Sequence, residues 1–221
     1  MSWNWEVISE TGLQFFGKMS ASISHELKNV LAIINENAGL LEDLTVMAEK
    51  GMPMDPLRLK TQASRIMKQI RRGDDIIKGM NRFAHSVDEP LRQTDVNDTL
   101  TLMCALSNRF ASMRGIRLEL EPPSIPIPVV TSPFFLQNLI WLCLEFAMGC
   151  AGAGKIVFLK AEKTEGGAKI KFSKLQDMAQ VETGSFPGER ERALLRALKA
   201  DLVIHKEMEE LRLTFPVQAE G

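Results

Sequence analysis

The sequence predicts two regions of different fold class: an α-helical hairpin that forms a dimeric four-helix bundle, followed by an α+β sandwich. Apolar or small residues recur in alternating steps of three and four, first from Leu13 to Ala48 and again from Leu59 to Ala84. This is the heptad pattern of packed helices. After residues 87–96 the pattern gives way to short segments that alternate between helix and strand signals. We therefore expect one domain at residues 1–90 and a second at residues 91–221.

The hairpin turn is expected at KGMPMDP, residues 50–56, where one glycine and two prolines interrupt the heptad pattern. Each helix should run about 30 residues, or about 45 Å. Two helices cannot bury two wide apolar stripes by themselves, so a second copy of the hairpin is expected to complete a four-helix bundle. The alternative is that the hairpin packs on the rest of its own chain.

The second region predicts the order helix, strand, helix, two strands, helix, two strands. The first helices are expected at residues 99–113 and 132–148, with a strand at 115–121 between them. KIVFLKAEK and AKIKFSK should form strands joined by TEGG, which is a hairpin turn signal. The segment GERERALLRALKA should be the last helix, before two closing strands. This order predicts an α+β sandwich with helices on one face of the sheet.

Composition predicts a globular cytoplasmic protein. The 221 residues are 45% hydrophobic and carry a net charge of −1, which gives no field that would attract nucleic acid or a membrane surface. Cys104, Cys143 and Cys150 lie in apolar runs and are expected to be buried, reduced thiols. The longest apolar stretch, Leu139 to Ala151, is shorter than the ~20 residues that cross a bilayer and carries Glu145. The start MSWNWEVISE lacks the basic and apolar blocks of a signal peptide.

His25 is the strongest candidate for chemistry. If Ile23 and Leu27 occupy heptad positions d and a, His25 falls at position f and faces water. A histidine there contributes little to packing, so the choice lies between a reactive group and an ordinary solvated residue.

The neighbours of His25 favour the reactive reading. Glu26 can hold or accept the proton of one ring nitrogen and leave the other as a nucleophile. Asn29, one helical turn on, can orient a water or a phosphoryl oxygen. Lys28 adds a cation close to phosphate charge. This set of residues suits the transfer of a phosphoryl group.

The segment SHELKNVLAIINENAGLL resembles the H-box of the dimerisation and phosphoacceptor domain of bacterial two-component histidine kinases. The resemblance implies that His25 is phosphorylated and that Glu26 accepts its proton. It also implies that Glu26 and Asn29 form the acid-x-x-Asn pair associated with phosphatase activity. One departure is Val30, where many relatives have proline, so the helix is expected to be straighter here.

The second region is similar in its order of elements to the ATP-binding domain of the same kinases, but its nucleotide motifs are missing. Phe146-Ala147 stands where an Asn-Ala pair supplies the magnesium-binding asparagine, and Leu142 occupies the other usual asparagine position. Asn138 lies two turns too early to replace them. The glycines of CAGAGK are read as a turn, because the Ser or Thr that follows the lysine of a P-loop is missing.

The adenine-binding motif of the family, Asp-x-Gly-x-Gly, is replaced at Lys174, Gln176 and Met178. A lysine cannot accept the hydrogen bond of the adenine amino group. In TGSFPGERE, Glu189 and Glu191 would stand close to the phosphates and oppose them.

The resemblance therefore implies a histidine phosphotransferase that exchanges phosphoryl groups between His25 and receiver-domain aspartates of response regulators in a phosphorelay, without ATP-dependent autophosphorylation. The expected partners are a second copy of the chain, a receiver domain that brings its own Mg²⁺, and an upstream histidine kinase. No cofactor of its own, no nucleic acid and no membrane are expected. The alternatives are a phosphatase of a phosphorylated regulator, a non-catalytic dimeric adaptor, and an active sensor kinase with a divergent ATP site. His85 and His205 are weaker candidates, and neither has metal-ligand spacing.

Overall fold

The computed structural model describes residues 4–123, 125–182 and 184–216. Ser124 of the proline-rich segment and Thr183 of the TGSFPGERE segment lie outside the described residues. The chain packs as two compact units, one of residues 20–82 and one that combines the residues up to Met19 with those from Phe83 onward. The functional domains 1–90 and 91–221 stay a prediction. None of the described helices is both long enough and apolar enough to span a membrane.

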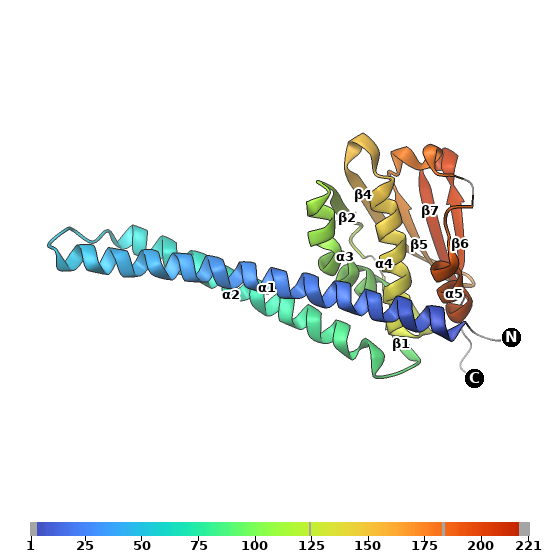
Figure 1. Ribbon diagram of the computed structural model, residues 1–221, viewed down its shortest axis with the longest axis horizontal. Helices are drawn as coiled ribbons and strands as arrows, with labels where there is room; N and C mark the ends of the chain where they lie inside the picture. The colour runs from blue at the N-terminus through green and yellow to red at the C-terminus, as the bar shows by residue number, and fades with distance from the viewer. Residues whose placement is uncertain (1–3, 124, 183, 217–221) are drawn as a thin grey trace. The chain divides into compact units, whose positions relative to one another are not determined.

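The unit of residues 20–82 is a pair of helices joined by a turn (Figure 1). It comprises most of α1 (Trp5–Glu49) and of α2 (Pro56–Ala84). The predicted length of about 30 residues is right for α2, which has 29 residues, whereas α1 has 45. Ile23, Val30 and Asn37 of α1 are at most 5% exposed, so the heptad pattern predicted their burial correctly.

The second heptad stripe, on α2, is only partly buried within one chain. Gly73 is buried, but Ile70 and Ile77 are 48% and 44% exposed. Met67 and Met80 extend this exposed stripe by one position at each end. A stripe of large apolar side chains on α2 is what a second copy of the hairpin was expected to cover, and the dimer stays a prediction.

The first four turns of α1 pack differently from the prediction. Leu13 and Phe16 were expected in the heptad stripe, but they are 75% and 40% exposed, and Phe15 is buried instead. The Phe15 ring lies 5.4 Å from that of Phe83 and 5.6 Å from that of Phe134. The buried face shifts by one residue because this part of α1 belongs to the core of the second unit and not to the helix pair.

The second unit contains a five-stranded sheet in the order β2-β4-β5-β7-β6. Strands β2 and β4 are parallel, and the other neighbours are antiparallel. The strands are β2 (Arg117–Leu120), β4 (Ile156–Thr164), β5 (Gly167–Ser173), β6 (Asp201–His205) and β7 (Glu210–Pro216). This is the predicted order of elements.

A smaller two-stranded sheet was not predicted in full. It pairs β1 (Arg92–Asp95) with β3 (Pro128–Thr131) in antiparallel register. No strand was predicted at residues 92–95. Four residues with two exposed side chains carry almost no periodic signal, and their partner strand lies more than thirty residues further along the chain.

Three helices cover one face of the five-stranded sheet (Figure 1), as predicted. They are α3 (Val96–Met113), α4 (Pro133–Gly149) and α5 (Glu189–Leu198). Along β5, Ile170 and Phe172 are fully buried, while the alternating Lys169 and Lys171 are half-buried on the other face. Helix α4 is the centre of this core, because most of its residues are buried. Short 3₁₀ segments lie at His85–Val87, Gly152–Gly154, Gln176–Gln180 and Lys206–Met208.

The TEGG turn between β4 and β5 requires its last glycine. Gly167 has a φ of +149°, and a Cβ at this position would lie 1.8 Å from the carbonyl oxygen of Phe215 on β7. Only a residue without a side chain fits between these strands.

Candidate functional site

His25 lies in α1 with its side chain exposed, as its predicted heptad position requires. Ile23 on the opposite side of the helix is buried, and Leu27 is half-buried. Lys28 and Asn29 are also exposed. Because residues four positions apart lie on the same side of a helix, His25 and Asn29 are neighbours on a solvent-facing surface. The structure thus presents all three side chains to a partner.

Glu26 forms an ion pair that the sequence analysis did not predict. Its Oε2 accepts a hydrogen bond from Nη2 of Arg72 on α2. The Glu26 side chain is 26% exposed and that of Arg72 is 48% exposed. The carboxylate next to His25 is therefore bonded to the opposite helix of the pair, and the role of Glu26 as proton acceptor stays a prediction.

The two helices approach each other closely beside this ion pair. A Cβ built on Gly73 would lie 3.3 Å from Cγ1 of Val30, which is tighter than an ordinary van der Waals contact. Val30 is one helical turn beyond Glu26, and Gly73 follows Arg72. The absence of a side chain at Gly73 thus brings the helices together at the level of the Glu26–Arg72 pair.

The sequence contains no signal for the partner of Glu26. In an antiparallel hairpin, counting outward from the turn at residues 50–55 places Glu26 opposite Gly79 and Arg72 opposite Ile33. Arg72 lies about two helical turns before Gly79, so the ion pair depends on how the two helices pack.

In the second unit, the residues at the expected magnesium-binding position form an aromatic stack. Phe146 of α4 lies with its ring centroid 4.0 Å from that of Phe186, and the two ring planes differ by 8°. Both side chains are half-buried. A phenylalanine offers Mg²⁺ no oxygen ligand, and this pair fills space with apolar surface.

The residues at the expected adenine-binding positions are engaged in internal contacts. Lys174 donates to Glu119 at 3.1 Å, and its Nζ lies 5.6 Å from the centre of the Phe158 ring. Gln176 accepts a hydrogen bond from the Gly154 amide at 2.8 Å. A Cβ on Gly152 would lie 2.8 Å from Cβ of the same glutamine. The glycine segment after α4 therefore packs against Gln176 and forms the predicted turn.

Glu191 is not the exposed charge that was expected near a phosphate site. Its side chain is buried, and its Oε2 accepts a hydrogen bond from the Gly188 amide at 2.7 Å at the start of α5. This is a helix-capping contact. Glu189 is exposed and accepts a hydrogen bond from Asn4. These residues do not fit the binding of Mg-ATP by the family's motifs.

The remaining titratable side chains that the structure describes give no second site. His85 bonds Asp88 at 2.7 Å just after α2. The three cysteines are free thiols. Burial raises the pKa of Cys104 to about 12 and raises that of Cys143 further, so both are unreactive. Among the described residues, no group of three His, Cys, Asp or Glu side chains could hold a metal ion.

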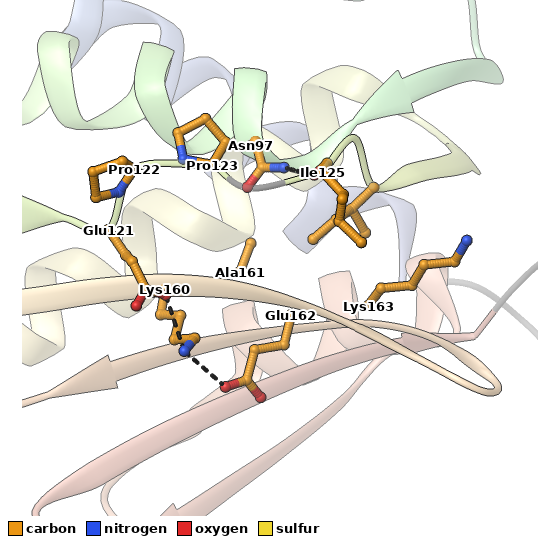
Figure 2. Close-up of a pocket in the computed structure, with 10 residues that line it drawn as sticks. Asn97, Glu121, Pro122, Pro123, Ile125, Lys160, Ala161, Glu162 and Lys163 are labelled. Atoms are coloured by element: carbon orange, nitrogen blue, oxygen red, sulfur yellow. Dashed lines mark hydrogen bonds and ion pairs between the residues drawn. The ribbon is translucent and has the colours of Figure 1, made fainter.

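A pocket of 360 Å³ lies in the second unit between the start of α3, the segment after β2 and strand β4 (Figure 2). Lys160 is one of its lining residues and is paired with Glu121 at 3.0 Å and with Glu162 at 3.6 Å. Glu162 in turn pairs with Lys169 and Lys171. Because Lys160 is already paired with two carboxylates, it is a weak candidate for phosphate binding.

No protein-family model matches the chain, and no curated protein matches it. Among solved structures, the chain is similar to the histidine kinase AdeS of Acinetobacter baumannii, with 11% identity and a TM-score of 0.47 over 88% of this chain and 98% of that chain.

It is also similar to a bacterial phosphotransferase, with 13% identity and a TM-score of 0.48 over 91% of this chain and 95% of that chain. A third similar structure is the histidine kinase ThkA in complex with the response regulator protein TrrA. Here the identity is 14% and the TM-score 0.46, over 98% of this chain and 66% of that chain.

Proposed function

We propose that this protein is a homodimeric two-component phosphotransfer protein, in which His25 exchanges a phosphoryl group with the receiver aspartate of a response regulator. The observation that carries the proposal is the exposed imidazole of His25 on an ordered helix, next to a carboxylate that is held in place. Asn29 and Lys28 on the same exposed segment complete a polar surface of the kind that a receiver domain would contact.

The transfer step needs no group beyond the two proteins and the receiver's Mg²⁺. The unprotonated ring nitrogen of His25 attacks phosphorus, the bond between phosphorus and the aspartate oxygen breaks, and the receiver carboxylate leaves with the bonding electrons. Glu26 accepts the proton from the other ring nitrogen, so that the phosphorylated ring is neutral and the carboxyl group of Glu26 is protonated. The reverse step returns the phosphoryl group to a receiver aspartate.

The second unit supports a role without ATP-dependent autophosphorylation. Phe146, Lys174 and Gln176 stand where the resemblance would place the Mg-ATP-binding residues, and they are engaged in an aromatic stack and in internal hydrogen bonds. A kinase with a divergent ATP site remains the competing function, and titration calorimetry with a non-hydrolysable Mg-ATP analogue distinguishes the two. We expect no binding heat at ligand concentrations up to about 1 mM, whereas a micromolar isotherm would favour the kinase.

The proposal is tested by incubating the full chain with a panel of receiver proteins phosphorylated with ³²P. We expect label to move to the chain in a form that is stable in alkali and labile in acid, which separates phosphohistidine from aspartyl phosphate. His25→Ala should remove this label. If receivers bind to the chain but no receiver labels it, the adaptor function is correct. If receivers lose phosphate without any labelling of His25, the phosphatase function is correct.

A further inference from the structure

We infer that Arg72 is a positioning residue for phosphoryl exchange: its guanidinium holds the Glu26 carboxylate and thereby sets how well Glu26 serves His25. This inference rests on the proposed function. It assigns a role to a residue of α2, on the helix opposite to His25.

The need for a positioning residue follows from helix geometry. Adjacent residues of an α-helix point about 100° apart and do not face each other. Glu26 therefore does not lie on the His25 surface by its place in the sequence alone. A glutamate side chain also has several rotatable bonds, and a contact from outside the helix must select one arrangement. In this structure the contact is the bond from Nη2 of Arg72.

Arginine suits this role better than other cations. Its guanidinium is planar, always charged and carries five N–H donors in a fixed fork, so that one bond to Glu26 leaves donor capacity on the same group. The charge of Arg72 also lies beside a site where a phosphoryl group would add negative charge.

The packing beside the pair keeps the two residues within reach of each other. Gly73 follows Arg72 and lies against Val30, with the close approach of 3.3 Å described above. Both residues are buried, whereas Glu26 and Arg72 are partly exposed at the edge of the same contact. The buried contact fixes the helix spacing, and the ion pair at its edge stays accessible to a partner.

A double-mutant cycle on the full chain tests the inference. The rate of His25 labelling from a ³²P-phosphorylated receiver is measured for Arg72→Ala, Glu26→Gln, the double variant, Arg72→Lys, and Arg71→Ala as the matched control on the adjacent exposed position. We expect Arg72→Ala to slow labelling about 10-fold, since a misplaced catalytic group costs one to two orders of magnitude. Arg72→Lys should recover part of the rate. Arg71→Ala should label like wild type.

The double variant is decisive, because a residue that acts through Glu26 has no further effect once the carboxylate is gone. Arg72→Ala in the Glu26→Gln background should therefore be no slower than Glu26→Gln alone. The inference is wrong if the two substitutions slow labelling independently, so that their factors multiply in the double variant. It is also wrong if Arg72→Ala takes label as fast as wild type. Thermal melting shows whether a slower rate comes from a folding defect. If Arg72→Ala melts at a lower temperature than wild type, Arg72→Gln takes its place in the same cycle. Failure of wild type itself to take label would reject the proposed function instead.

Discussion

The helix pair of residues 20–82 and the α+β unit use their polar residues in opposite ways. In the helix pair, His25, Lys28 and Asn29 project into solvent, and Glu26 forms an ion pair with Arg72. In the α+β unit, Gln176 and Glu191 are bonded to backbone amides of the same unit. The comparison shows that the named polar side chains of the helix pair are accessible to a partner, whereas these two side chains are satisfied internally.

This difference also has an energetic side. An exposed histidine contributes little to folding, so it can be retained for chemistry without a cost in stability. The stacked rings of Phe146 and Phe186, in contrast, contribute to the packing of the α+β unit. The two regions thus differ in how much these side chains add to folding stability.

The largest expected effect concerns His25 itself. His25→Ala should abolish labelling by phosphorylated receivers, because the nucleophile is gone, while the melting temperature changes by less than about 2 °C since the side chain is exposed. The measurement is the alkali-stable label on the protein together with thermal melting. His85→Ala is the control, being an exposed histidine outside the site that should label normally. If His25→Ala still takes label, another residue accepts the phosphoryl group, and the contrast between the two regions no longer holds.

The second expected effect concerns the exposed stripe of α2. Replacing Ile70 and Ile77 together by glutamate should weaken self-association at least about 100-fold, because each buried isoleucine contributes roughly 1.5–3 kcal/mol and a charge replaces it. Sedimentation velocity over a concentration series measures the change. Val203→Glu, an exposed apolar position on β6, is the control and should leave association unchanged. A wild-type chain that sediments as a monomer at all concentrations would reject the dimer.

A smaller effect is expected at Asn29. Asn29→Ala should leave the rate of transfer to His25 unaltered and slow the hydrolysis of the phosphohistidine about 3- to 10-fold, because the amide that orients a water is lost. The measurement is the decay of label after the donor receiver is removed, with Asn35→Ala on the same exposed helix as control. A variant that instead loses only the ability to dephosphorylate the receiver would favour the phosphatase function.

The elements that periodicity specifies were predictable, and the contacts between distant residues were not. The heptad pattern predicted both long helices and the exposure of His25, because each depends on the position of one residue within its own helix. The Glu26–Arg72 pair joins residues 46 positions apart, and the shift to Phe15 at the start of α1 depends on packing against Phe83 and Phe134. Such pairings are fixed by tertiary structure, which a local pattern does not encode.

The smallest expected effect concerns the outer face of the sheet. Partial burial would raise the pKa of Glu162, but the hydrogen bonds and charges of Lys171 and Lys169 outweigh it and lower the pKa to about 2 from 4.5. Because the folded-state pKa is depressed, the stabilisation is complete above about pH 5 and is lost as the pH falls toward 2.

Glu162→Gln should therefore reduce the free energy of unfolding by about 1–2 kcal/mol at pH 7, discounted for a side chain that is 24% exposed, and by almost nothing at pH 2. Urea denaturation at both pH values measures this difference, with Glu165→Gln at the exposed turn as control. A loss of stability that is the same at both pH values would mean that Glu162 contributes through packing and not through its charge. The lysines of β4 and β5 would then be available to a negatively charged partner, and the α+β unit would no longer differ from the helix pair in having its charges satisfied internally.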